Sequence, residues 1–234
     1  MDMTQSDKAA PMEQALVSRV SQKELSRWVK ENALAYRELM AYCRAGAAAL
    51  EASLQRAREE LALEQDGDPV ESVETEVKPA GEIVDQLLAE GVPLTAENIE
   101  KSIRDIVCVE AVCLFPTELY LLADAVLRDP EITLLHREDM TEAPGKNGYR
   151  ALCLLLSLPV TLRGQTRNVK VELRLQTGVM RLWSAVEQRL RRQKDIIAPE
   201  QVRQELIACA ALGAELDARL EQIRYNIEHR VITK

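Results

Sequence analysis

The stretch Val169-Lys170-Val171-Glu172-Leu173-Arg174-Leu175-Gln176-Thr177 decides the fold class of this chain, because apolar and polar residues alternate along it. Side chains two residues apart lie on the same face of a β-strand. One face therefore carries Val169, Val171, Leu173 and Leu175, and the other carries Lys170, Glu172, Arg174 and Gln176. The pattern predicts a strand with one face on a core and a polar opposite face.

Further strand-like and helix-like stretches alternate around this strand. We predict strands at 106–115, 132–137 and 149–160, of which the last is nearly all apolar and therefore central. Helical patterns lie between them and before them, at 82–89, 95–104, 116–128 and 179–194. This alternation predicts an α+β fold, with a mixed β-sheet flanked by helices.

Long helices are predicted at both ends of the chain. Ser21 and Glu24 have the spacing of a capping box, and helical periodicity continues to Gln65, with Gly46 as a candidate kink or break. Pro199 suits the first turn of a second long helix that extends to His229. We divide the chain into a flexible N-terminus, an N-terminal helical region, an α+β domain and a C-terminal helix, at 1–20, 21–66, 67–195 and 196–234.

Composition excludes several classes of protein. The 234 residues are 47% hydrophobic and 29% charged, which is typical of a globular protein and not of a disordered one. With 30 Lys and Arg against 38 Asp and Glu, the net charge is -8, so we expect no general binding to nucleic acid or membranes. The apolar run 151–160 is too short to span a bilayer. Residues 1–11 lack the apolar segment of a secretory signal.

The cysteines indicate a reducing compartment. Five of them are scattered through apolar surroundings without a Cys-x-x-Cys pair, and the chain has two histidines. This pattern favours free thiols in a cytoplasmic protein and argues against a zinc site.

One candidate site is the loop Pro144-Gly145-Lys146-Asn147-Gly148-Tyr149-Arg150, which enters the apolar strand. Gly148 permits an unusual backbone angle, and a tyrosine at the mouth of a strand can stack on a flat base. The alternative is a hairpin turn with a packed tyrosine ring. The chain has no Gly-rich phosphate loop, Gly-x-Ser-x-Gly elbow or His-Glu-x-x-His motif that would indicate another site.

A second candidate site consists of two carboxylates. Glu172 lies on the polar face of its strand, and Asp105 begins another strand. Two carboxylates from neighbouring strands can hold a magnesium ion that bridges phosphates. The alternative is a pair of solvated acids at strand edges.

Taken in order, several segments of the α+β domain resemble the motifs of one family. The matching segments are 69–73, 76–78, 105–111, 113–115, 119–120, 146–153 and 172–177, followed by Met180, Trp183, Glu187 and Gln188 and by the C-terminal Leu206-x-x-Cys209-Ala210. Together they resemble the synthetase domain of the RelA/SpoT family, and most of all its small alarmone synthetases. Each match alone is weak, and their order and spacing are specific.

The resemblance implies a nucleotidyltransferase-like fold and a reaction. The family transfers pyrophosphate from ATP to the ribose 3′-hydroxyl of GTP or GDP. By this resemblance Asp105 and Glu172 would hold Mg²⁺, and Glu172 would also take the proton of the attacking hydroxyl. Tyr149 would stack on guanine and Lys78 would contact phosphate. The other nucleotide-binding candidates are Lys146, Asn147, Gly148, Arg150 and Arg174.

The chain departs from the family pattern at several positions, and by the resemblance some of the lost groups are cations that face the ATP phosphates. Acids replace arginines at Glu76 and Glu110, Gln86 replaces a lysine, Cys153 and Gln188 replace histidines, and Arg174 and Gln176 are exchanged. A hydrogen bond to a charged group contributes about 1.5–3 kcal/mol, so losing three of them costs on the order of 4–9 kcal/mol. We therefore predict a degenerate synthetase that binds guanine nucleotide and has lost much of its ATP-dependent catalysis.

Two alternatives stay open. The first is an active GTP pyrophosphokinase with a rebuilt donor site, in which charge comes from Arg174, Arg163, Arg167 or Lys146. The second is a helical scaffold without a ligand.

The terminal helices also predict self-association. Both carry apolar stripes, and the resemblance implies that such helices assemble symmetric homo-oligomers. The alternative is that the two helices pack on each other.

Overall fold

The fold was analysed in a computed structural model that describes residues 22–64, 67–191 and 199–229, with side chains from residue 34 in the first range and from residue 200 in the third. The prediction of a flexible N-terminus at 1–20 lies outside these residues, and so does the capping box of Ser21 and Glu24, which depends on side chains that the structure does not describe.

A five-stranded sheet with the order β1-β2-β5-β4-β3 forms the centre of the molecule. Its strands are β1 (Val70–Val77), β2 (Val107–Cys113), β3 (Thr133–Asp139), β4 (Leu152–Leu162) and β5 (Gln165–Thr177). Only the β2–β5 pair is parallel, and β4 and β5 form a long hairpin. The predicted α+β fold with a mixed sheet flanked by helices is therefore confirmed.

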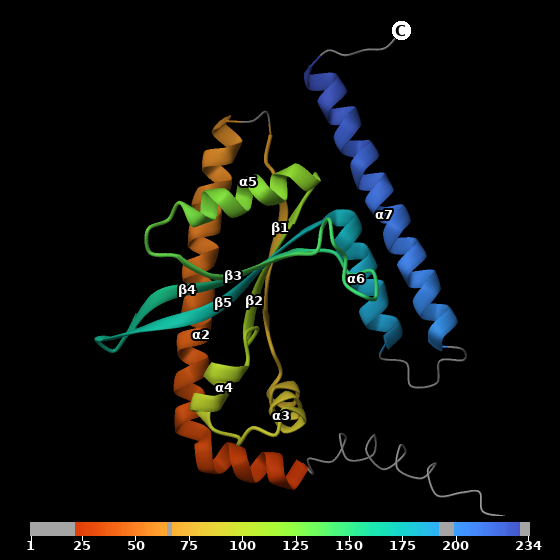
Figure 1. The fold of residues 1–234 in the computed structure, drawn as a ribbon. Helices are drawn as coiled ribbons and strands as arrows, with labels where there is room; N and C mark the ends of the chain where they lie inside the picture. Colours follow the sequence, from red (N-terminus) through yellow and green to blue (C-terminus); the bar gives the residue numbers. More distant parts are fainter. Residues whose placement is uncertain (1–21, 65–66, 192–198, 230–234) are drawn as a thin grey trace, which may run out of the picture.

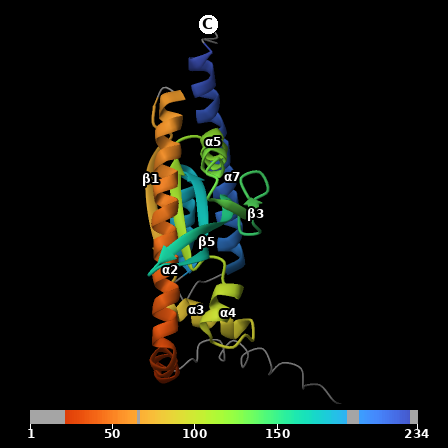
Figure 2. The same cartoon turned by 90° about the vertical axis from the view of Figure 1, so that its left-hand side faces the viewer.

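Helix α2 (Gln22–Glu64) crosses the apolar face of the sheet (Figures 1 and 2). Leu50 and Leu54 of α2, at most 1% exposed, pack in the same core as Val171 and Leu173 of β5. Gly46 of α2 lies against β5, where an added Cβ would be 3.0 Å from Val169 Cγ1 and 3.1 Å from Val171 Cγ2. The candidate break at Gly46 is wrong: the helix is continuous, and the glycine permits close packing.

The polar face of the sheet is covered in part by α6 (Gly178–Arg191) and by α7 (Pro199–Glu228), which lie on the side opposite α2 (Figures 1 and 2). Trp183 Nε1 of α6 donates to the carbonyl of Leu206 on α7 at 2.8 Å. The hydroxyl of Thr177, at the end of β5, donates to the buried Asp217 of α7 at 2.7 Å. These contacts place α7 on the α+β domain and not on α2.

Shorter helices close the ends of the sheet. They are α3 (Ala80–Ala89), α4 (Ala96–Ser102) and α5 (Pro116–Leu127). Thr95 caps α4, because its side chain accepts from the backbone N–H of Asn98 at 3.1 Å. No described helix combines the length and the apolar character that crossing a bilayer requires.

Strand β1 was not predicted. Its residues Glu71, Glu74 and Glu76 interrupt any apolar alternation, and most of its side chains are exposed because it lies at the edge of the sheet. The predicted strand at 149–160 begins later, at Leu152. Residues 145–149 instead form a tight turn, in which the N–H of Gly145 donates to the carbonyl of Tyr149 at 2.9 Å.

Candidate functional site

A polar cleft lies on the face of the sheet opposite α2. It has two lobes of about 360 and 420 Å³, and both are lined by Glu76, Arg174 and Gln188. The first lobe also contains Asn147 and Tyr149, and the second contains Lys78 and Asp105. The structure thus brings residues of both candidate sites, Asn147 and Tyr149 of the loop and Asp105 of the carboxylate pair, to one cleft.

Tyr149 lies in the first lobe and is half-buried. Asn147 Oδ1 accepts from the backbone N–H of Tyr149 at 3.2 Å, and Asn147 Nδ2 donates to Glu187 Oε1 at 3.4 Å. Burial raises the pKa of the Tyr149 hydroxyl, so the ring stays neutral. A neutral half-buried ring at the wall of a cleft is chemically suited to stacking on a base.

Lys78 and Asp105 pair with each other in the second lobe. Lys78 Nζ is 2.5 Å from Asp105 Oδ1, and it also donates to Gln86 Oε1 at 3.0 Å. The side chain of Lys78 is 15% exposed and that of Asp105 is 34% exposed, so the pair is only partly solvated. The lysine predicted to contact phosphate is therefore already neutralised by the chain.

A chain of alternating charges runs through the centre of the cleft. Arg174 Nη2 is 2.7 Å from Glu172 Oε1, and Arg174 Nη1 is 3.6 Å from Glu110 Oε2. Arg181 of α6 pairs with Glu110 through Nε, and its Nη2 is 3.3 Å from Glu74 Oε2. The order Glu172–Arg174–Glu110–Arg181–Glu74 joins β5, β2, α6 and β1.

Two thiols lie beside the Glu172–Arg174 end of this chain of charges. In the sheet register Cys108 of β2 is opposite Glu172 and Cys153 of β4 is opposite Arg174. Cys108 Sγ donates to Glu172 Oε1 at 3.6 Å. Burial raises the pKa of Cys108 above its ordinary value and that of Cys153 to about 12, so neither thiol is a nucleophile near neutral pH.

The two predicted magnesium ligands do not form a preformed metal site. Carboxylate oxygens are the ligands that Mg²⁺ prefers. However, one oxygen of Asp105 is bound by Lys78, and one oxygen of Glu172 is bound by Arg174 and Cys108. In the described residues no group of three or more His, Cys, Asp or Glu side chains is arranged around a common metal position. The residues present therefore do not fit a preformed Mg²⁺ site.

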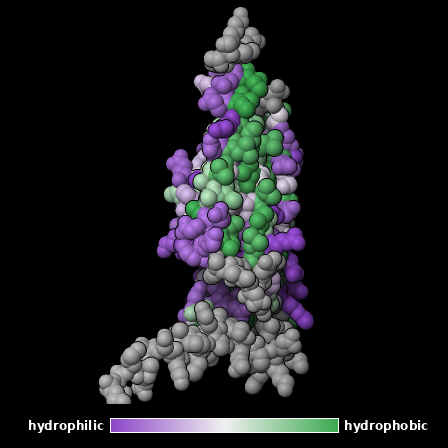
Figure 3. Space-filling model, turned by 90° about the vertical axis from the view of Figure 1, so that its right-hand side faces the viewer, coloured by the Kyte–Doolittle hydropathy of each residue, from purple (hydrophilic) through white to green (hydrophobic). Residues whose placement is uncertain are grey.

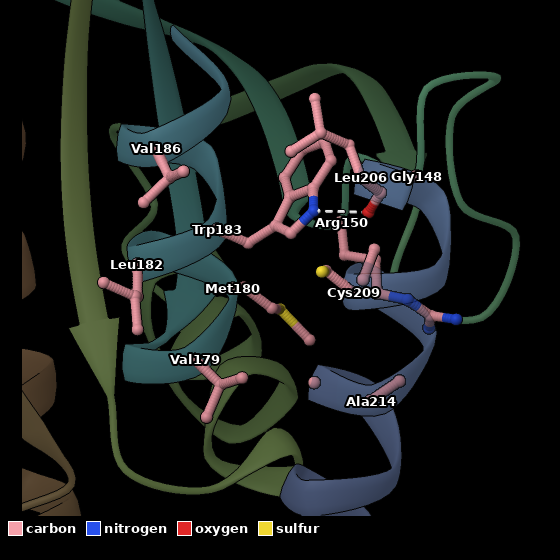
Figure 4. Close-up of a pocket in the computed structure, with 12 residues that line it drawn as sticks. Gly148, Arg150, Val179, Met180, Leu182, Trp183, Val186, Leu206, Cys209 and Ala214 are labelled. Atoms are coloured by element: carbon pink, nitrogen blue, oxygen red, sulfur yellow. Dashed lines mark hydrogen bonds between the residues drawn. The ribbon is translucent and has the colours of Figure 1, made fainter. Parts of the chain in front are cut away.

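Gly148 and Arg150, both predicted to bind nucleotide, instead line an apolar pocket between α6 and α7 (Figure 4). Gly148 has φ +92°, and an added Cβ would be 2.9 Å from the Cβ of Ala210 on α7. Arg150 donates through Nη1 to the carbonyl of Thr141. In this structure both residues position the loop against α7 and do not face the polar cleft.

The side chain of Lys146 is exposed, and its carbonyl accepts from Arg203 Nη1 of α7 at 3.5 Å. It is not among the residues that line the cleft. Five residues of the predicted set line the cleft: Asp105, Lys78, Asn147, Tyr149 and Arg174. Glu172 does not line it and pairs with Arg174 on the same strand.

Sequence reasoning missed Arg181 as a cleft residue. Arg181, Ser184, Gln188 and Arg191 recur at intervals of three to four residues and all line the first lobe. Their helical spacing was therefore a usable signal for a polar face of α6. Nothing in the sequence indicated that this face would lie over Glu110, because the two residues are 71 positions apart (181 − 110).

The comparisons with known proteins point to one group. No protein-family model matches the chain. The GTP pyrophosphokinase YwaC of Bacillus subtilis is 26% identical over 161 residues, which are 69% of this chain and 77% of that protein. The GTP pyrophosphokinase YjbM of the same organism is 24% identical over 179 residues, or 76% of this chain and 83% of that protein.

Structure leads to the same group. Small alarmone synthetase 1 from Bacillus subtilis, solved with its product pppGpp, superimposes with a TM-score of 0.74 at 23% identity. The match covers 82% of this chain and 98% of that one. The homologues of this chain are small alarmone synthetases. The resemblance to the RelA/SpoT synthetase domain that the motifs indicated is thereby confirmed, and with it the fold that small alarmone synthetases share.

Proposed function

We propose that this small alarmone synthetase homologue binds guanine nucleotide in the polar cleft and has lost most of the ATP-dependent transfer of pyrophosphate. It would act as a regulatory module, cytoplasmic and homo-oligomeric. The five cysteines, all of them free, suit a reducing compartment.

The observation that carries this proposal is the pairing of every described cation that lines the cleft. Lys78 is paired with Asp105, Arg174 with Glu172 and Glu110, Arg181 with Glu110 and Glu74, and Arg191 with Glu187. Phosphoryl-type transfer depends on cations that are free to stabilise developing charge on phosphate oxygens. Here each of these cations must first break an ion pair with a carboxylate of the chain, and breaking such a pair in a partly buried place costs free energy.

The first lobe of the cleft supports the proposal that guanine nucleotide binds there. Tyr149 presents a half-buried ring there, and Asn147 fixes its backbone. The structural neighbour described above carries pppGpp, a guanine nucleotide. We propose that guanine stacks on Tyr149 and that Asn147 contributes polar contacts.

The proposal is tested by titrating the protein with GDP, GTP, ATP and AMP in the presence of Mg²⁺, with calorimetry as readout. We expect saturable binding of GDP and GTP and binding of ATP that is weaker by at least about tenfold, which corresponds to one charge-assisted hydrogen bond. ATP that binds as tightly as GDP would contradict the degenerate donor site. A complete absence of guanine nucleotide binding would contradict the function itself.

One observation favours the alternative of an active pyrophosphokinase. Arg174, a candidate cation for a rebuilt donor site, lies next to Glu172, the candidate base, and the Glu172 carboxylate is only 18% exposed. In that case incubation with labelled ATP, GDP and Mg²⁺ yields 3′-pyrophosphorylated product, and Glu172→Gln abolishes it because the base is lost. Glu71→Gln, an exposed acid on β1 that does not line the cleft, is the matched control and should keep full activity. Product formation by the Glu172→Gln variant would exclude Glu172 as the base.

We propose that the C-terminal half of α7 forms a contact between copies of the chain. Figure 3 shows an apolar stripe along the face that α7 presents. Its exposed members alternate at intervals of three and four residues, which is the spacing of a coiled-coil seam: Leu216, Leu220, Ile223 and Ile227, which are 48%, 40%, 54% and 70% exposed. Earlier seam positions, Leu206, Cys209 and Gly213, line the pocket against α6.

Charged substitutions in this seam are expected to dissociate the oligomer. In the double variant Leu216→Glu and Leu220→Glu, carboxylates would have to be desolvated at the interface, so light scattering should report a monomer at micromolar concentration. Ala218→Glu, on an exposed position of the same helix outside the seam, should keep the wild-type mass. A monomeric wild-type protein would reject the contact.

A further inference from the structure

A buried acid lies between two arginines at the centre of the cleft. Glu110 of β2 is 6% exposed. Arg174 approaches its Oε2 at 3.6 Å from β5, and Arg181 pairs with its Oε1 from α6. Two guanidinium groups from different elements thus converge on one carboxylate.

The surroundings do not favour a carboxylate at this place. The register of β1 and β2 puts Glu74 directly opposite Glu110, and Glu76 is on the same strand. Burial raises the pKa of Glu110, and the two arginines act in the opposite direction, while Glu76 and Glu74 raise it further. A buried ion pair often stabilises a protein no more than well-packed apolar side chains of similar volume do. The stability of the sheet therefore does not by itself explain an acid at position 110.

The geometry suits an oxyanion from outside the chain. Paired arginines are the usual recognition groups for phosphate oxygens, because each guanidinium offers several N–H donors in a plane. Arg174 and Arg181 both line the first lobe, and Arg174 also lines the second, so an anion between them would lie where the two lobes meet.

We propose that Arg174 and Arg181 form an oxyanion-binding pair that the chain fills with its own Glu110. Glu110 is then the specificity-determining residue that excludes a polyphosphate chain from the centre of the cleft. The ligand class that remains is a nucleotide whose phosphates do not need this pair. This inference rests on the proposed function only in placing nucleotide in the same cleft.

The test removes the charge of Glu110 and keeps its shape. Sodium tripolyphosphate, which carries no base, is titrated into the wild type and into Glu110→Gln, with calorimetry as readout. The dissociation constant should fall by at least about tenfold in Glu110→Gln, because each guanidinium gains a charge-assisted bond to the probe. In the double variant Glu110→Gln and Arg181→Ala the gain should disappear.

Glu71→Gln is the control for overall charge. It removes the same formal charge from β1 at an exposed position outside the cleft lining, and it should leave tripolyphosphate binding unchanged. An equal gain in Glu71→Gln, or no gain in a folded Glu110→Gln variant, would overturn the inference.

Folding of the variants is checked by thermal denaturation. If Glu110→Gln does not fold, Glu110→Thr, which keeps good strand propensity, replaces it. If neither variant folds, Glu110 serves the stability of the sheet and the inference is wrong. GDP titration of the wild type separates the two claims. If the wild type does not bind GDP but Glu110→Gln binds tripolyphosphate more tightly, only the proposed function is overturned. If the wild type binds GDP but Glu110→Gln shows no gain in tripolyphosphate binding, only the role of Glu110 is overturned.

Discussion

Replacing Gly46 with leucine is expected to prevent α2 from docking on the sheet. Even a Cβ at this position would be 3.0 Å from Val169 and 3.1 Å from Val171, and both of these side chains are buried. A leucine adds three further carbons that have no space, so helix and sheet must move apart along their shared core. Overpacking of this kind typically costs about 1–3 kcal/mol for smaller insertions, so we expect a loss of more than about 3 kcal/mol in the free energy of unfolding.

Urea denaturation followed by circular dichroism measures this loss. Ala48→Leu and Ala49→Leu are the matched controls, because both positions are exposed on the same helix. They should change the free energy of unfolding by less than about 0.5 kcal/mol, since leucine and alanine are both good helix formers. A Gly46→Leu variant as stable as these controls would show that α2 does not lie against β5 as described.

Replacing Tyr149 with alanine is expected to have the largest effect on ligand binding. Stacking of a base on an aromatic ring contributes about 1–3 kcal/mol, which corresponds to a loss of about 5- to 150-fold in affinity for GDP. Tyr149→Phe should keep most of the affinity, because the stacking face is unchanged. GDP titration of both variants against the wild type gives this comparison.

Stability measurements on the Tyr149 variants decide between a ligand-stacking and a core role. The ring is half-buried at the cleft wall, so its removal should cost less than the roughly 3–5 kcal/mol of a fully buried aromatic side chain. A Tyr149→Ala variant that loses that much stability and binds GDP normally when folded would place the ring in the core. It would also remove the stacking claim.

The sequence by itself determined the elements whose pattern is local. Alternation in β5, the apolar run of β4, and the helical periods of α5, α6 and α7 all predict the structure that is found. Such patterns are readable because burial of one face imposes a period of 2 or 3.6 on neighbouring residues. The order and spacing of the motifs likewise indicated the synthetase-like domain. Strand β1 was not predicted, because an edge strand with Glu71, Glu74 and Glu76 has no buried face and therefore no apolar alternation in its sequence.

Only the tertiary structure decided how the cleft is filled. The sequence showed Glu110 as an acid at an unusual place, and it could not show that Arg174 and Arg181 neutralise it from β5 and α6. The sequence also could not show that Gly148 packs against α7, where the absence of a side chain at Gly148 leaves space for Ala210. These outcomes depend on distances between elements far apart in the chain. Those distances are set by sheet register and helix packing, to which all of the core contributes and which no local pattern records.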